Sequence, residues 1–223
     1  MSIEAMRIPL VVLVGAFNSQ ILRDPKWVQK YLFPTSTQRE IPVTFNVALD
    51  SGALSSNMTI DGIDFQAEPG RVRITPAKLE KADIDAVNDV LVHLASALPH
   101  TPLSAYGINF QFMSKPGKSV LRTREKSLVD IFKTNGDVQQ LKLESRVKYE
   151  DSLLTFSLTE RGSGKKTQQL YDFNFHCQLG NQQIAAMDTL QNAITHGVIE
   201  KYLEQANKII VSASSKLISA RGK

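Results

Sequence analysis

The order of apolar and polar positions predicts strands in the first third of the chain. A continuous apolar run at 11–14 is typical of a strand that is covered on both faces. From Val43 onward, apolar residues recur at every second position, in short runs separated by turn residues. The Asp61-Gly62 pair between two of these runs is typical of a tight hairpin. The pattern therefore predicts an antiparallel meander over 43–74.

Strict alternation also marks the last third of the chain. It predicts three long strands, at 141–149, 154–159 and 171–179, with one polar face. A single long helix is expected to follow. Its apolar stripe comprises Ile184, Met187, Ile194, Val198, Tyr202, Ala206 and Ile209, widened by Ile199, Leu203 and Ile210. Buried large apolar side chains contribute about 1.5–3 kcal/mol each, so the stripe represents on the order of 10 kcal/mol as an upper estimate. We therefore expect this helix to lie across the apolar face of the three strands.

Helix starts and apolar spacing predict further elements. Asp24-Pro25 is typical of a helix start, and the apolar face of that short helix would carry Trp27, Val28, Tyr31 and Leu32. Thr75-Pro76 repeats the same device before a longer helix that ends near Leu98. Further predictions are a strand over 106–112 and a short helix with Leu128, Ile131 and Phe132 turned inward.

Together these elements predict an α+β fold. Its mostly antiparallel sheet would be arranged in two loosely similar halves, each a meander followed by a helix, with the long C-terminal amphipathic helix packed on the sheet. One domain over 1–223 is expected, with two subdomains, 1–114 and 127–223, joined by a connector at 115–126 as the alternative. The strands at 106–112 and 171–177 resemble each other. Either a duplication or two ordinary strands of similar pattern explains that likeness.

Composition narrows the class of protein. With 42% apolar and 22% charged residues among 223, the chain is typical of globular proteins and unlike disordered ones. Its single cysteine, Cys177, has no intramolecular disulfide partner, which favours a reducing compartment and hence the cytoplasm. The apolar run after Arg7 is too short to span a bilayer. We expect this run to be a buried strand. The alternative is a signal-like segment, but Glu4 reduces the positive charge that such a segment carries before its apolar run.

The string GSGKKT at 162–167 suggests a phosphate-binding loop. Such a loop needs Ser or Thr directly after Gly-Lys and a helix that follows it. Here Lys166 follows Gly164-Lys165, and the flanking segments alternate like strands on both sides. The segment is therefore predicted to be a hairpin loop. The glycine turn at Gly15 lacks the other glycines of a dinucleotide fingerprint, so no cofactor is predicted.

No residue pattern in the chain indicates a metal or catalytic centre. The four histidines, His93, His100, His176 and His196, lack metal-ligand spacing. Adjacent His176 and Cys177 point to opposite faces of a strand, and Cys177 is predicted to be a small buried apolar residue. Because the acidic residues are scattered, the sequence favours a non-enzymatic protein and identifies no catalytic residue.

Two segments are rich in basic residues. The candidate anion or nucleic-acid contacts are Lys115, Lys118, Arg122, Arg124, Lys126, Arg161, Lys165 and Lys166. If both segments lie at the same end of the sheet, they form a patch that can neutralise several phosphates. The alternative is that charged loops keep the strand ends soluble, and the absence of aromatic residues in these loops favours it. The net charge of +4 permits an anionic partner without requiring one.

Three functional hypotheses follow from the sequence. The first is a cytoplasmic, non-enzymatic binding or assembly module that self-associates or binds another protein, because the C-terminal stripe is wider than one sheet face covers. The second is association with nucleic acid through 115–126 and 161–166. The third is a small apolar ligand held between the long helix and the sheet.

Overall fold

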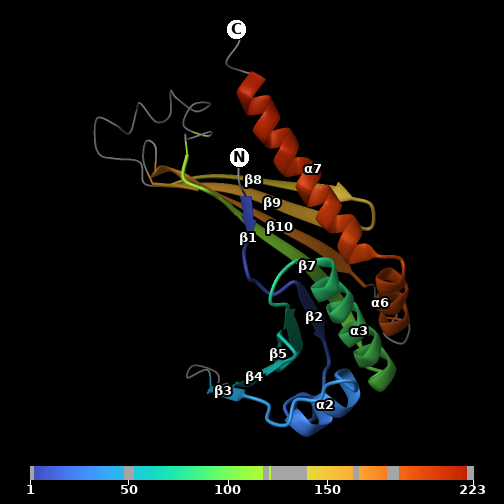
Figure 1. Cartoon of the computed structure of the whole chain (residues 1–223). Helices are drawn as coiled ribbons and strands as arrows, with labels where there is room; N and C mark the ends of the chain where they lie inside the picture. The colour runs from blue at the N-terminus through green and yellow to red at the C-terminus, as the bar shows by residue number, and fades with distance from the viewer. Residues whose placement is uncertain are drawn as a thin grey trace. The chain divides into compact units, whose positions relative to one another are not determined.

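The computed structural model describes residues 3–47, 53–117, 121, 140–162, 166–179 and 186–219, with side chains in the last two helices described for 187–213. The α+β class and the mostly antiparallel pairing are confirmed. The strands are β1 (Ile3–Ala5), β2 (Val11–Gly15), β3 (Val43–Val47), β4 (Leu54–Ile60), β5 (Ile63–Glu68), β6 (Arg71–Thr75), β7 (Leu103–Ser114), β8 (Gln140–Tyr149), β9 (Ser152–Arg161) and β10 (Gln168–Gln178). The helices are α1 (Ser19–Leu22), α2 (Pro25–Leu32), α3 (Lys81–Ala97), α6 (Ala186–Thr195) and α7 (Val198–Ser219). Figure 1 labels the last four of them.

The chain divides into two compact units that interleave along the sequence. Unit 1 contains Met1–Met6, Phe110–Asn174 and Leu203–Lys223, and unit 2 contains Arg7–Asn109 and Phe175–Tyr202. β7, β10 and α7 therefore contribute residues to both units. Most of the connector predicted at 115–126 lies outside the described residues, so the division of the chain at that connector stays a prediction.

Unit 2 contains the predicted meander. Its strand order is β3-β4-β5-β6-β2-β7-β10. The β4–β5 hairpin turns at Asp61 and Gly62, which have φ of 48° and 83°, as a two-residue turn of the predicted kind requires. The run at 11–14 forms β2 between β6 and β7, with Val11 and Leu13 buried. Unit 2 is therefore a sheet organised by local hairpins.

Two helix predictions in unit 2 need correction. Asp24 caps α2 as predicted and accepts a hydrogen bond from the Lys26 amide at 3.0 Å, but Tyr31 is exposed and its ring packs on Trp27 at the surface. The longer helix, α3, begins at Lys81 and not at Thr75-Pro76, because Thr75 pairs with Asp64 as the last residue of β6. Strand pairing therefore overrides the capping signal at that position.

Unit 1 is built on three long neighbouring strands. Its order is β7-β10-β9-β8, and β1 pairs with the last residues of β7, Phe112–Ser114. The β8–β9 hairpin pairs Leu143 with Leu158 and Val147 with Leu154. Phe173 of β10 contacts Phe112 and Phe156, with ring centroids 6.2 and 5.0 Å apart, so the core of unit 1 is centred on β10.

The single long helix predicted for the C-terminus is two helices. α6 ends at Thr195, and Gly197 adopts φ +67° with its amide bonded to the Ile194 carbonyl at 2.9 Å. A residue in the left-handed region ends a helix, and glycine is common at this position because residues with a Cβ rarely adopt that conformation. α7 then begins at Val198.

Packing of α7 on the sheet is confirmed. The Tyr202 ring stacks on the Phe175 ring at 4.2 Å with an interplanar angle of 9°, and both side chains are buried. The buried stripe of α7 consists of Ile199, Tyr202, Ala206 and Ile210. Val198 and Ile209, which were predicted to lie on it, are half-buried instead. The buried stripe therefore keeps Tyr202 and Ala206 and takes in Ile199 and Ile210 from the predicted widening.

Candidate functional site

The most prominent exposed feature of unit 1 is the apolar face of β8. In the strand order, β8 is terminal and pairs with β9. Leu143 is 41% exposed and Val147 is 53% exposed, although their cross-strand partners, Leu158 and Leu154, are buried. The apolar cover over this face therefore ends between β9 and β8. Among the described strands, this ten-residue strand has an exposed apolar side and an outer edge that no other strand pairs with.

The opposite side of β8 carries charges. Glu144 accepts a hydrogen bond from the Lys142 Nζ at 2.7 Å and lies 3.6 Å from the Arg146 guanidinium. The hydrogen bond and positive charge of Lys142, with a smaller contribution from Arg146, lower the pKa of Glu144. Across the hairpin, Glu144 faces Ser157 and Arg146 faces Thr155, both neutral. These charges are therefore paired along their own strand and not across to β9.

β3 is the corresponding terminal strand of unit 2. Phe45 is 55% exposed and Val47 is 59% exposed, on the same face as buried Met58 of β4. The five residues of β3 include no charged side chain. Its alternation correctly predicts a strand, but the strand is not half-buried. Pro42, which has no amide hydrogen, directly precedes it.

The two basic segments of the sequence converge at their bases. The Gly117 amide donates to the Thr167 carbonyl at 2.8 Å, in an isolated bridge between the segments. Lys115, Arg161 and Lys166 are exposed. The remaining five candidates lie outside the described residues: Lys118, Arg122, Arg124, Lys126 and Lys165.

The predicted hairpin at 162–167 is confirmed, because the loop joins β9 to its neighbour β10 and no helix follows it. Gly162 has φ +90°, and a Cβ at this position would lie 2.8 Å from the Lys166 carbonyl oxygen. Only glycine fits this turn without strain.

A buried polar cluster lies on the strands that carry these loops. The Glu160 carboxylate, which is 1% exposed, accepts hydrogen bonds from the Leu121 amide at 2.9 Å and from the Gln169 amide side chain at 3.2 Å. The Tyr171 hydroxyl donates to the Gln169 side-chain oxygen at 2.7 Å, and Ser114 Oγ accepts from the Gln169 backbone amide at 3.0 Å. Sequence reasoning missed this cluster. The signal was present, since Glu160 continues the inward-facing series of Leu154, Phe156 and Leu158.

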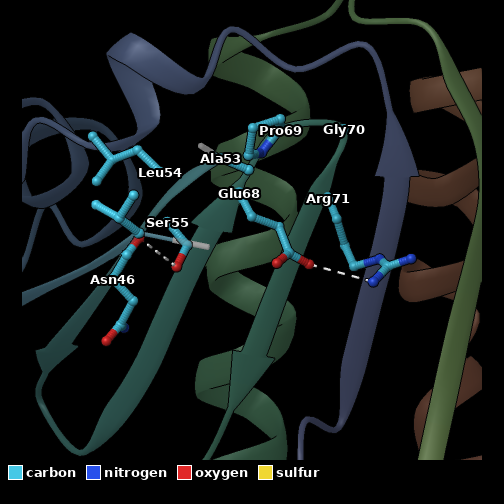
Figure 2. A pocket seen from close by; sticks show the side chains of 9 residues that line it. Asn46, Ala53, Leu54, Ser55, Glu68, Pro69, Gly70 and Arg71 are labelled. Atoms are coloured by element: carbon cyan, nitrogen blue, oxygen red, sulfur yellow. Dashed lines mark hydrogen bonds and ion pairs between the residues drawn. The ribbon is translucent and has the colours of Figure 1, made fainter. Parts of the chain in front are cut away.

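A pocket of about 440 Å³ in unit 2 lies where β3 ends and β4 begins, beside the β5–β6 turn (Figure 2). Glu68 provides its acidic group, but this carboxylate already pairs with Arg71 at 3.4 Å and Arg73 at 3.0 Å. Ser55 Oγ donates to the Asn46 carbonyl at 3.5 Å. The pocket therefore has its charges neutralised internally and presents no nucleophile beside a base.

The histidines and the cysteine occupy structural positions. His93 Nδ1 lies 3.2 Å from the Leu32 carbonyl, which joins α3 to α2. Cys177 is buried as predicted, with its Sγ 3.6 Å from the Tyr202 hydroxyl, while His176 points to the other face. Within the described residues, no group of three His, Cys, Asp or Glu side chains is arranged to hold a metal ion.

Comparisons with known proteins give no further guidance: no protein-family model, no curated protein and no solved structure matches this chain. Among the described helices, none combines the length and the apolar character needed to cross a bilayer. The exposed edge strand β8 and the converging basic segments are therefore the features from which a function can be argued.

Proposed function

We propose that this protein is a cytoplasmic, non-enzymatic assembly module that associates through the apolar face of β8 and through the edge of β8 that is unpaired among the described strands. The observation that carries this proposal is the exposure of Leu143 and Val147, at 41% and 53%, in the same cross-strand rows as buried leucines of β9. Large apolar side chains that continue a core row into solvent are typical of a surface that another chain covers. Addition of a strand to a sheet edge is a common mode of protein association.

The length of β8 supports the proposal further. Natural sheets protect their edges with short strands or with charges. β8 has ten residues and carries charges on one face only, so its apolar face is left unprotected. A partner strand would satisfy the backbone groups of that edge and remove both apolar side chains from water at the same time.

Sedimentation velocity over a range of protein concentrations tests this proposal. Wild-type protein is expected to associate, and Leu143→Asp with Val147→Asp is expected to weaken association at least about tenfold, because a charge would be buried in the contact. The matched control is Leu153→Asp, since Leu153 is 43% exposed on the opposite face of the hairpin and should leave association intact. Wild-type protein that stays monomeric up to its highest soluble concentration would overturn the proposal.

A second candidate function is association with nucleic acid, and the Gly117–Thr167 bridge is the observation that favours it. The bridge brings the bases of the two basic segments together, as a phosphate-binding patch requires, and leaves Lys115 and Lys166 exposed beside it. Affinity for single-stranded RNA or DNA should then fall steeply as salt rises.

Fluorescence polarisation with a labelled oligonucleotide measures this second function. Lys165→Glu with Lys166→Glu is expected to weaken binding and flatten its salt dependence. Lys78→Glu with Lys81→Glu makes the same charge change at exposed lysines of unit 2 and is the control. Equal binding by both double variants would eliminate the 161–166 loop. The third sequence hypothesis, an apolar ligand under α7, receives no support from the direct contact between the Phe175 and Tyr202 rings.

A further inference from the structure

We infer that the partner of β8 is β8 of a second copy of this chain, paired antiparallel about a two-fold axis at Ser145. This inference rests on the proposed assembly function and specifies its partner and register. In a two-fold antiparallel pair, residues equally distant from the axis lie opposite each other and keep the same face of the sheet. Ser145 is at the middle of the strand, so this register pairs β8 along almost its whole length.

The apolar face of β8 is self-complementary in this register. Leu143 lies opposite Val147 of the second copy, and Leu141 lies opposite Tyr149 of the second copy, each pair occurring twice. In its own chain, Leu143 and Val147 already sit beside buried Leu158 and Leu154. The new pairs therefore extend two existing apolar rows across the edge into the partner, where both exposed side chains become covered.

The charged face is complementary in the same register. Glu144 lies opposite Arg146 of the second copy, again twice by symmetry, whereas the hairpin offers each of them a neutral partner on β9. Lys142 lies opposite Lys148 of the second copy, which is unfavourable. Its ammonium group is, however, held by its own Glu144 at 2.7 Å, and this ion pair offsets the repulsion.

Neighbouring registers are disfavoured by the same charges. An axis at residue 144 places Glu144 opposite Glu144 of the second copy, and an axis at residue 146 places Arg146 opposite Arg146 of the second copy. Both are contacts between like charges. An axis at Leu143 avoids both clashes but leaves Val147 without a cross-strand partner among 140–149. β3 offers no such discrimination, because none of its five residues is charged. The charged and apolar positions of β8 together therefore favour the register about Ser145 in a pair of identical strands.

Cysteine cross-linking tests the register directly. The native Cys177 is buried, so a cysteine introduced on β8 is the reactive thiol. With a short thiol-to-thiol cross-linker, Ser145→Cys is expected to give a covalent dimer. Leu143→Cys and Val147→Cys are expected to react poorly alone and to give a covalent heterodimer when mixed. Thr44→Cys on β3 is the control that should stay uncross-linked.

Charge reversal provides an independent test. Glu144→Arg and Arg146→Glu should each weaken self-association at least about fivefold, because each creates two like-charge contacts across the axis. Mixing the two variants should restore association as a heterodimer, since both pairs between positions 144 and 146 are then opposite in charge. Changes in ion pairing within one chain cannot produce this rescue, because mixing does not alter either chain.

The outcomes separate this inference from the function on which it rests. Association without a Ser145→Cys link, or with a strong Leu143→Cys link alone, would overturn the register at Ser145 and leave the assembly function standing. Association without rescue on mixing the charge variants would overturn the second copy as the partner strand at β8. A wild-type monomer at every concentration would overturn the assembly function and this inference together.

Discussion

β10 and β8 share one sequence pattern and have opposite environments. Both alternate apolar and polar residues along most of their length, β8 with a serine at position 145 of its apolar series and β10 from Tyr171 onward. Phe173 and Phe175 of β10 are buried, whereas Leu143 and Val147 of β8 are exposed. Alternation therefore states which side chains share a face of a sheet. It does not state whether anything covers that face.

The position of each strand explains the difference. A helix is about 10 Å wide with its side chains, and strands lie about 4.8 Å apart, so one helix covers about two strands. Tyr202 of α7 stacks on Phe175 of β10, and β9 lies between β10 and β8 in the strand order. The pKa of Lys208 in α7 is raised mainly by Glu204 and in smaller part by Tyr149, so the helix comes near the end of β8. Leu143 and Val147, further along the strand, nevertheless remain exposed.

The largest expected effect contrasts one apolar residue from each strand. Phe175→Ala should lower the free energy of unfolding by about 3–5 kcal/mol, because it removes a buried ring and leaves a cavity under Tyr202. Val147→Ala in the monomer should change it by less than about 0.5 kcal/mol. Urea unfolding at concentrations that favour the monomer measures both. Similar costs at the two positions would refute the contrast between the strands.

An intermediate effect is expected from glutamines on the same two strands. Gln169→Ala should cost about 1–3 kcal/mol, since the buried Glu160 carboxylate and Tyr171 hydroxyl each lose a hydrogen-bond partner. Gln140→Ala, at the exposed end of β8, should be close to neutral. Thermal or urea unfolding of the two variants measures the loss in stability at each position. If Gln169→Ala were as mild as Gln140→Ala, the buried cluster would add little to stability.

The smallest effect concerns ionisation on the polar face of β8. Lys142 lowers the pKa of Glu144, so the stabilisation from the ionised carboxylate is complete above the ordinary value of 4.5 and is lost as pH falls through the lower folded pKa. Lys142→Ala should raise the titration midpoint of Glu144 towards 4.5. NMR observation of the Glu144 carboxyl carbon measures the midpoint. An unchanged midpoint would show that Lys142 is not the cause.

Much of the fold was predictable because its signals are local. The Asp61-Gly62 hairpin, the Asp24 cap and the alternation of the last three strands each depend on residues close in sequence, and each was confirmed. The start of α3 and the break at Gly197 were missed. At Thr75, a capping signal competed with pairing to Asp64, and a local reading cannot weigh a partner strand.

The candidate site was predictable only in part. The basic residues could be identified as a set, but their convergence depends on Gly117 bonding to Thr167, fifty positions away in sequence. The exposed face of β8 could not be identified, because its residues have the same pattern as a buried strand.

The sequence by itself determined the element types, the hairpin turns and the two chemically distinct faces of each strand, because backbone periodicity and turn chemistry are local properties. Only the tertiary structure decided which of those faces α7 covers and which strand ends the order. Those outcomes depend on which strands become neighbours and on where the helix packs, and neither is encoded within the ten residues of β8.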